Sequence, residues 1–532
     1  MTENNLNEGS ALHSRVYIFV IILLSIITRI FFLLTPAGRS GDADEAVFGM
    51  MAQAIVHLKE YPIIFWEAHY SGAPVAYVAA IIFKLFGDGF VQLHLAMMIV
   101  VLPGFLIFYH VYRRLFGGQV AFVAVLFLIF CPYLVLRYTT GVGGGYGESF
   151  LGTALIILLS WNIKDQTLNI PAGVSYFLLG LTSGFFAYVH FYVLPAILVF
   201  AVPVLWSVGV NRVKLFWRFC LGGFVGIAPL IIYNFLNKGG TLTRAAAWIL
   251  LIGRDDVSAA PMDVARNILL KKGAYLAEWF FNAPLMFGQY VMPSIFGHKI
   301  QIVAGFLLII LFVVYIVSSF KEINKRELVG SYHRQFALYL LVFILFQWMA
   351  SLHVVRHFMP IFFVIPIALF SVFKKSAKLM QVSSVIVLLL CTFQVIGWVQ
   401  ASRVIGFDAR PVVKVMENQG IREFYSSYWI GYPIMFLADG RLIGSPILLP
   451  YHEPFGERRP QYTEQVVRSR NAAFIFGDGE EAVMNDFLSF LNQQNITSTL
   501  AKINGVSIFY HLSKPVGVSF NKTGWSNSFF LK

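Results

Sequence analysis

The chain has 532 residues, of which 58% are hydrophobic and only 13% are charged, and its formal net charge is +13. Soluble domains carry roughly 25% charged residues, so the composition excludes a soluble globular protein and predicts a polytopic membrane protein. The basic residues lie in short loops between apolar segments, where topology signals and lipid headgroup contacts are expected, and this distribution argues against a nucleic-acid partner. The three cysteines lie inside apolar segments, without the spacing of a disulfide framework or a metal site.

Apolar segments of about the ~20 residues that a helix needs to cross the hydrocarbon core follow one another along most of the chain. We predict about eleven spans, at 15–36, 91–112, 118–137, 148–163, 171–189, 192–209, 217–236, 300–320, 335–352, 357–373 and 379–400. The first has the length of a full span and lacks a small-residue cleavage site, so we expect it to remain as a helix.

The orientation follows from Lys and Arg, which gather in alternate short loops such as Arg113–Arg114, Arg212–Arg218 and Lys374–Lys378. By the positive-inside rule, these loops and the N-terminus are cytoplasmic. An odd number of spans then places the C-terminal region outside the cytoplasm, in a multi-pass protein of the inner (plasma) membrane. Two long loops, 37–90 and 237–299, fall on the non-cytoplasmic side, where long ordered loops often carry sites.

The first outer loop, 37–90, begins with three carboxylates in four positions, Asp42, Asp44 and Glu45. Apolar residues from Ala43 to Leu58 recur with helical spacing, which predicts an amphipathic helix on the membrane surface. Asp42 and Glu45 have the spacing of a capping box, so their simplest role is to hold the start of that helix. Asp44 has no capping role. It is either a surface carboxylate that complements the helix dipole or a group that accepts a proton from, or orients, a hydroxyl nucleophile.

Aromatic residues follow between Tyr61 and Tyr70, and they fit an interfacial belt or a surface on which a sugar stacks. Glu67 and His69 lie within this belt, and either is a candidate for a second acid or a metal ligand. The sequence leaves both roles open beside a purely structural one.

A phosphate-bearing lipid would need cations near the outer surface. Arg137 lies at the outer end of the third span, Arg254 in the second long loop, and Arg356 and His357 at the outer end of the tenth span. Each is a candidate ligand for phosphate, and the alternative is a side chain that anchors its helix at the interface. Glu148 opens the fourth span, where a carboxylate faces either a pocket or a pairing partner such as Arg137.

The composition changes near residue 404, where long apolar runs stop. Short β-rich runs alternate with helical patterns, which predicts a small α/β domain over 404–513. We expect the tail, 514–532, to be poorly ordered. The transmembrane domain accordingly covers 1–403.

Several motifs resemble the GT-C superfamily of membrane glycosyltransferases, in particular its bacterial branch related to protein O-mannosyltransferases and the lipid A aminoarabinose transferase. The resemblance rests on Asp44–Ala52 with Phe65–Trp66 and His69–Gly72, on Gly144–Glu148, on Arg356–Pro360 and on Ile421–Tyr432. It implies a GT-C fold, with about eleven transmembrane helices, juxtamembrane helices in the first outer loop and the small outer α/β domain.

The same resemblance implies a sugar donor carried on a polyprenyl phosphate and transfer on the non-cytoplasmic face. The acidic residue of the family's first loop corresponds to Asp44, with Glu45 beside it and Glu67 as the nearest equivalent of a second acid. Members of the superfamily differ in their dependence on a divalent cation, so Mg²⁺ or Mn²⁺ at Asp44 and Glu45 stays open.

We therefore predict an integral-membrane glycosyltransferase that moves one sugar from a polyprenyl-phosphate donor to a glycan, lipid or protein acceptor. A transporter or flippase of lipid-linked sugars is the first alternative, but the midspan regions are nearly uncharged and the polar residues gather at one face. A polysaccharide polymerase or ligase is the second, and it would use a diphosphate-linked donor.

Overall fold

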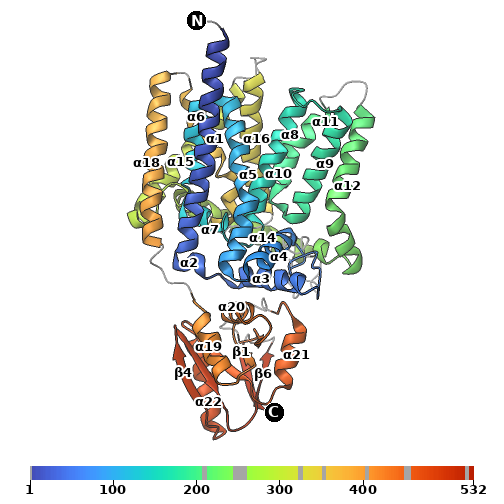
Figure 1. Cartoon of the computed structure of the whole chain (residues 1–532), viewed down its shortest axis with the longest axis vertical. Helices are drawn as coiled ribbons and strands as arrows, with labels where there is room; N and C mark the ends of the chain where they lie inside the picture. The colour runs from blue at the N-terminus through green and yellow to red at the C-terminus, as the bar shows by residue number, and fades with distance from the viewer. Residues whose placement is uncertain are drawn as a thin grey trace.

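We describe a computed structural model of the chain, at residues 3–206, 212–243, 261–321, 328–349, 355–374, 376–401, 407–448, 457–521 and 526–532. A bundle of long apolar helices and a smaller α/β domain are stacked along the longest axis of the molecule (Figure 1). The N-terminus lies at the end of the bundle farthest from the C-terminal domain (Figure 1).

Six helices in the described part of the chain are long and apolar enough to cross a membrane. They are α1 (Glu3–Leu34), α5 (Phe90–Phe116), α9 (Ala172–Val189), α12 (Arg212–Leu236), α15 (Gly297–Lys321) and α18 (Ala377–Ala401). Where the other predicted spans are described they are largely helical, and several of them are short or interrupted. The polytopic helical architecture is thus confirmed, and the count of eleven spans stays a prediction.

The interruptions have local causes. The predicted span 118–137 is divided at Pro132, which cannot continue the hydrogen-bond ladder of the preceding helix. After α9 the backbone of His190 is extended, so the next segment begins afresh. The remaining segments of the bundle are α6 (Gly118–Ile129), α7 (Tyr133–Tyr138), α8 (Tyr146–Lys164), η1 (Phe191–Val193), α10 (Leu194–Ala196), η2 (Ile197–Ala201), α11 (Val202–Trp206), α16 (Leu328–Met349), η6 (Val355–Ile361) and α17 (Val364–Phe373).

Both long outer loops contain helices. The first holds α2 (Pro36–Arg39), α3 (Ala43–Val56) and α4 (Pro74–Phe86), as the prediction of juxtamembrane helices requires. The second holds α14 (Pro261–Gly288) and η4 (Ser294–Phe296). Our prediction that α3 lies on the membrane surface with one apolar face is incomplete, because every residue from Glu45 to Gln53 is buried. The C-terminal domain covers its outer side.

The C-terminal domain is built on a five-stranded sheet in the order β2-β1-β3-β5-β4, in which β1 pairs in parallel with β2 and β3 while β5 is antiparallel to β3 and β4. Its elements are α19 (Arg410–Asn418), β1 (Glu423–Tyr425), α20 (Tyr428–Ala438), β2 (Ile443–Ser445), α21 (Pro460–Arg468), β3 (Ala473–Gly477), α22 (Glu481–Gln493), β4 (Thr499–Ile503) and β5 (Val506–Tyr510). The expected α/β character is present. The expectation of a disordered tail is wrong, because β6 (Val516–Asn521) and β7 (Ser526–Leu531) form a hairpin.

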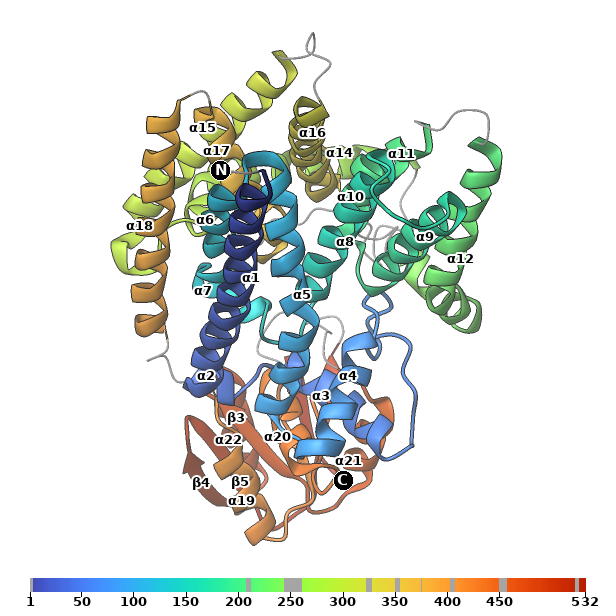
Figure 2. The same ribbon diagram turned by 45° about the horizontal axis from the view of Figure 1, so that its top comes forward.

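Helix α20 joins the domain to the bundle by packing along α3 (Figure 2). The ring of Phe436 is fully buried there and packs against Phe90, with 4.9 Å between ring centroids. A Cβ at Gly49 would lie 2.4 Å from the Phe436 ring, so glycine is what lets the two helices approach. This contact brings the start of α20 to the acidic start of α3.

Candidate functional site

The start of α3 is held by the predicted capping box. The Asp42 carboxylate accepts a hydrogen bond from the backbone N–H of Glu45 at 3.0 Å, and Glu45 Oε2 accepts one from the backbone N–H of Asp42 at 2.9 Å. Asp42 also forms an ion pair with Arg137, at 3.2 Å between Oδ2 and Nη2. Burial, followed by the charges of Glu45 and Asp44, raises the pKa of Asp42 to about 7 against the opposing effect of Arg137.

Glu45 is enclosed. Its Oε1 lies 3.3 Å from Nε2 of His94, a fully buried residue of α5. A Cβ at Gly141 would lie 2.1 Å from the same oxygen, so the chain from α7 to α8 passes directly over the carboxylate. With one oxygen on the cap and the other against His94, Glu45 is placed to hold the helix start, and its predicted catalytic role stays a prediction.

Asp44 points toward the C-terminal domain. Its Oδ1 accepts a hydrogen bond from the hydroxyl of Tyr428, the first residue of α20, at 2.5 Å. The guanidinium of Arg458 lies over the Tyr428 ring at 5.5 Å and over the Phe65 ring at 4.9 Å. Asp44, the acid to which the sequence assigns no capping role, is thus partly exposed. It faces Tyr428 and Arg458, which lie far from it along the chain.

The first-loop aromatics pack against arginines of the C-terminal domain. Besides the Phe65–Arg458 contact, Trp66 lies 4.2 Å from the guanidinium of Arg459. That guanidinium also makes two hydrogen bonds to the carboxylate of Glu60, at 2.8 and 2.6 Å. The predicted belt therefore includes an interface between domains, while Tyr61 stays 61% exposed.

Glu67 and His69 lie in a tight loop of the same segment. Both have positive φ, +55° and +65°, in the left-handed region that few residues other than glycine adopt. His69 Nδ1 lies 2.5 Å from the hydroxyl of Tyr233 at the end of α12, and the charge of Glu67 acts on the same tyrosine. Strained backbone of this kind is common at functional sites, and the ligand roles predicted for both residues stay predictions.

Arg137 and Arg356, predicted from separate spans, flank one tyrosine. The Arg137 guanidinium lies 6.0 Å from the ring centre of Tyr138, and the side chain of Tyr138 also interacts with Arg356. Both arginines are accessible, Arg137 with 41% of its side chain exposed. The structure thus brings two cations to one place beside the start of α3.

His357 belongs to an aromatic cluster next to these arginines. Its Nδ1 lies 3.1 Å from the hydroxyl of Tyr146 and is also hydrogen-bonded to Tyr192. The Tyr146 ring packs against Tyr138 at 5.0 Å, which makes the cluster continuous with the arginine pair. The His190 ring packs against Tyr192, with 4.0 Å between ring centroids, and belongs to the same cluster.

The remaining predicted residues have other positions. Glu148 is buried at the start of α8, and its Oε2 has no hydrogen-bond partner among the described residues. The pairing that we suggested with Arg137 is not formed, because Arg137 pairs with Asp42. Arg254 lies outside the described residues.

Three residues of the site were not singled out from the sequence: Tyr428, Arg458 and His94. Tyr428 was part of a motif that resembles the family, but nothing local linked it to Asp44. His94 is a lone histidine in a long apolar helix, and Arg458 belongs to a pair of arginines in the outer domain. Only the folded chain shows that all three contact the acidic start of α3 or its partners.

The acids do not form a metal site with one another. Within the part of the chain that the structure describes, no three His, Cys, Asp or Glu residues converge as ligands. Asp44 faces Tyr428, whereas Glu45 faces His94, so two consecutive carboxylates are directed to different partners. These residues do not fit the divalent cation that the resemblance left open, and no step below depends on one.

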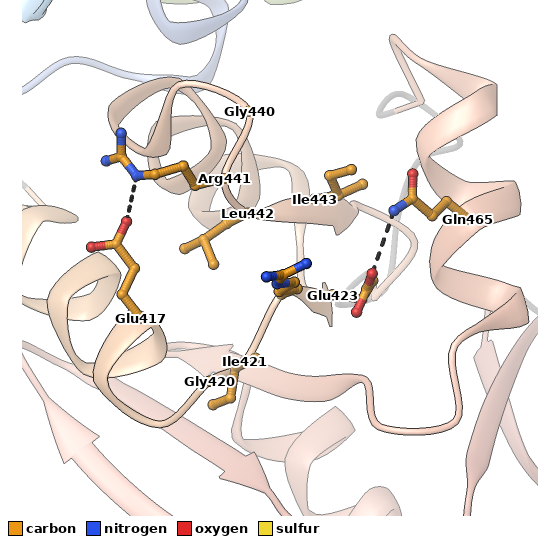
Figure 3. Close-up of a pocket in the computed structure, with 10 residues that line it drawn as sticks. Glu417, Gly420, Ile421, Glu423, Gly440, Arg441, Leu442, Ile443 and Gln465 are labelled. Carbon is orange, nitrogen blue, oxygen red and sulfur yellow. Dashed lines mark hydrogen bonds and ion pairs between the residues drawn. The ribbon is translucent and has the colours of Figure 1, made fainter.

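A surface cavity of about 630 Å³ lies elsewhere, in the C-terminal domain (Figure 3). It is bordered by the ion pair between Glu417 and Arg441, at 2.7 Å, and by Glu423 with Gln465. These residues lie at the amino ends of β1 and β2, whereas the carboxyl end of β1 leads to Tyr428. The cavity is therefore on the opposite edge of the sheet from the acids.

No protein-family model matches the sequence, and no curated protein matches it significantly. Among solved structures, the Archaeoglobus fulgidus oligosaccharyltransferase complex with Zn and sulfate shares 12% identity over 93% of this chain and 72% of its own, with a TM-score of 0.55. ArnT from Cupriavidus metallidurans bound to undecaprenyl phosphate shares 13% identity over 94% and 98%, with a TM-score of 0.51. Archaeal AglB with an inhibitory peptide and a dolichol-phosphate shares 12% over 98% and 74%, with a TM-score of 0.53. The chain thus shares the overall fold of these three solved structures, the fold that the resemblance predicted.

Proposed function

From the GT-C fold that the chain shares with these membrane transferases, we propose that it is an integral-membrane glycosyltransferase with a polyprenyl-phosphate sugar as donor. The observation that carries the proposal is the convergence, at one end of the bundle, of a partly exposed carboxylate, Asp44, with two accessible arginines, Arg137 and Arg356. A nucleophile-orienting acid next to an anion-binding pair is what transfer from a lipid phosphate requires.

Arg137 and Arg356 are the proposed ligands of the donor phosphate. Guanidinium groups bind phosphate through paired, charge-assisted hydrogen bonds, and two of them compensate a charge that grows as the leaving group departs. Solved GT-C structures contain undecaprenyl phosphate or dolichol-phosphate, which supports a lipid of this class. His357 and the tyrosines around it would form the polar wall on which the headgroup rests.

Asp44 is the proposed catalytic residue. Its Oδ2 would accept the hydrogen bond of the acceptor hydroxyl, whose oxygen attacks the anomeric carbon of the donor sugar. The bond from that carbon to the phosphate oxygen breaks, and the lipid phosphate leaves with the electron pair. The proton of the hydroxyl passes to Asp44 late in the reaction and then to water, because a carboxylate at a helix N-terminus is a weak base.

The topology proposed for this reaction has the N-terminus in the cytoplasm and the C-terminal domain outside the plasma membrane. Basic residues support it: Arg113 is hydrogen-bonded to Ser14 near the start of α1, and Lys164 to Ser331 near the start of α16. The acids lie at the other end, beside the C-terminal domain (Figure 1). By the positive-inside rule, that end is non-cytoplasmic. The acceptor is a glycan, lipid or protein on that face.

The test offers the purified protein a panel of undecaprenyl- and dolichyl-phosphate sugars with an acceptor mixture and measures released lipid phosphate. We expect Asp44→Asn to lose at least about 100-fold in rate, the lower end of general acid–base contributions. Asp439→Asn is the matched control, since it also lies at the α3–α20 interface but pairs with His57. Full activity of Asp44→Asn would show that Asp44 is not the catalytic residue. Diphosphate-linked sugars are offered in parallel, and turnover only with them would indicate a polymerase or ligase.

A further inference from the structure

Two residues of the C-terminal domain reach the proposed catalytic acid. Tyr428 follows β1 directly, and its hydroxyl lies 2.5 Å from Asp44 Oδ1. Arg458 precedes α21, and its guanidinium lies over the Tyr428 ring, 5.5 Å from the ring centre. The C-terminal domain therefore presents a tyrosine and an arginine near a carboxylate that belongs to the first outer loop.

A carboxylate can only accept a hydrogen bond, so the Tyr428 hydroxyl gives its single proton to Asp44. The phenol therefore occupies Oδ1 of Asp44. No hydrogen bond to Oδ2 is formed by the described residues, and that oxygen remains for a substrate hydroxyl.

Arg458 is itself held in place. Its guanidinium lies between the rings of Phe65 and Tyr428, and its Nη1 lies 3.5 Å from the backbone oxygen of Trp66. Its backbone N–H donates to the hydroxyl of Tyr432 at 2.6 Å. The arginine that lies over the Tyr428 ring is thus fixed by the first outer loop on one side and by α20 on the other.

The phenol is suited to be a permanent donor. Burial, followed by the charge of Asp44, raises the pKa of Tyr428 well above its ordinary value, so the hydroxyl keeps its proton at working pH. It stabilises the carboxylate and does not compete with it for the proton of an acceptor.

We propose that Tyr428 and Arg458 are positioning residues, which hold Asp44 by Oδ1 so that Oδ2 faces the acceptor hydroxyl. The inference rests on the proposed glycosyl transfer and adds a requirement to it: the C-terminal domain must be docked on α3 for the acid to be aligned. A misplacement of about 1 Å in such a group costs on the order of 100-fold in rate.

The activity test compares Tyr428→Phe with Tyr425→Phe. The second variant removes a hydroxyl at the end of β1, which donates to the backbone oxygen of Val466 and not to Asp44. We expect Tyr428→Phe to lower kcat by about 10- to 100-fold with little change in KM for the donor, and Tyr425→Phe to lower it less than about 3-fold. Equal effects of the two variants would overturn the proposal.

A double-mutant cycle separates positioning from a general structural effect. Because Tyr428 acts through Asp44, Tyr428→Phe should change little in the Asp44→Asn background. Full additivity of the two losses would contradict the proposal. Arg458→Lys, which keeps the charge but loses the planar donor set, should fall between wild type and Tyr428→Phe.

A second readout needs no turnover and separates this inference from the proposed function. A water-soluble carbodiimide labels accessible carboxyl groups, and labelling of Asp44 is measured by peptide mass spectrometry. We expect several-fold faster labelling in Tyr428→Phe than in wild type or Tyr425→Phe. If wild type transfers no sugar, the proposed function fails while this comparison still decides whether Tyr428 holds Asp44, and equal labelling rates would show that it does not.

Discussion

Nε2 of His94 lies 3.3 Å from Oε1 of Glu45, and both side chains are almost completely buried. The other ring nitrogen, Nδ1, lies 3.0 Å from the carbonyl oxygen of Gly38, which can only accept a hydrogen bond. His94 therefore donates from Nδ1 to Gly38, and its Nε2 lies within ion-pair distance of the Glu45 carboxylate. Burial raises the pKa of Glu45, but the opposing effects of His94 and then Arg137 are larger, so this pKa lies below its ordinary value.

His94→Leu should destabilise the protein strongly. It leaves the buried carboxylate of Glu45 without its partner, a loss of about 3–5 kcal/mol for a buried pair. The measurement is the melting temperature in detergent. His94→Gln, which keeps a hydrogen-bond donor of similar reach, should lie between leucine and wild type, and a leucine variant that melts with wild type would contradict the pairing.

Gly141→Ala should destabilise the protein, whereas Gly143→Ala should have little effect on its stability. A Cβ at Gly141 would lie 2.1 Å from Glu45 Oε1 and 2.9 Å from the backbone oxygen of Arg137, whereas one at Gly143 meets no atom within 4 Å. Overpacking of this kind costs about 1–3 kcal/mol. The melting temperatures and transfer rates of the two variants form the comparison, and equal values would show that the loop moves freely over Glu45.

The sequence predicted what depends on neighbouring residues and missed what depends on distant ones. The capping box follows from a spacing of three between Asp42 and Glu45, so it was predictable and is present. The Tyr428–Asp44 contact joins residues 384 positions apart, and no periodicity carries that information. The hairpin of β6 and β7 was missed although Val516, Val518 and Phe520 alternate with Gly517 and Ser519 as in a half-buried strand, because the alternation covers only five residues.

The two predicted arginines show the same difference between what the sequence predicts and what only the fold shows. Arg137 and Arg356 were found because each lies at the outer end of an apolar span. That they flank one tyrosine was not predictable, since it depends on how α7 and η6 pack. The expected pair of Arg137 with Glu148 was wrong because the carboxylate of Asp42 lies within reach.

Stability should depend on pH through Asp42. Its pKa is raised from 3.8 to about 7 in the folded protein, chiefly by burial, so the folded state binds this proton more tightly than the unfolded chain. The stability that this bound proton contributes is fully present below the ordinary pKa of an aspartate, and it is lost as pH rises through about 7. Wild type should therefore lose stability relative to Asp42→Asn between pH 4 and pH 7, measured as the difference in melting temperature. A difference that is constant over this range would contradict the raised pKa.

Glu60 and Arg459 should be coupled across the two domains. Their two hydrogen bonds, at 2.8 and 2.6 Å, join the first outer loop to the C-terminal domain. Either single reversal, Glu60→Arg or Arg459→Glu, places like charges together and should lower both the melting temperature and the transfer rate. The double reversal should restore part of the loss, but not all of it, because the new glutamate cannot stack on Trp66 as Arg459 does. Strictly additive losses would show that the pair is not coupled.

Arg356→Gln should weaken donor binding more than it slows chemistry. Hydrogen bonds to a charged group contribute about 1.5–3 kcal/mol, so KM for the lipid-phosphate donor should rise roughly 10- to 100-fold. Arg137→Gln should combine this effect with a lower kcat, because Arg137 also pairs with Asp42 at the start of the helix that carries Asp44. Arg113→Gln is the matched control: it removes the same charge at the other end of the bundle, where Arg113 contacts Ser14. If Arg113→Gln raised KM as much as Arg356→Gln, the effect would come from net charge, and the phosphate would have to be bound elsewhere.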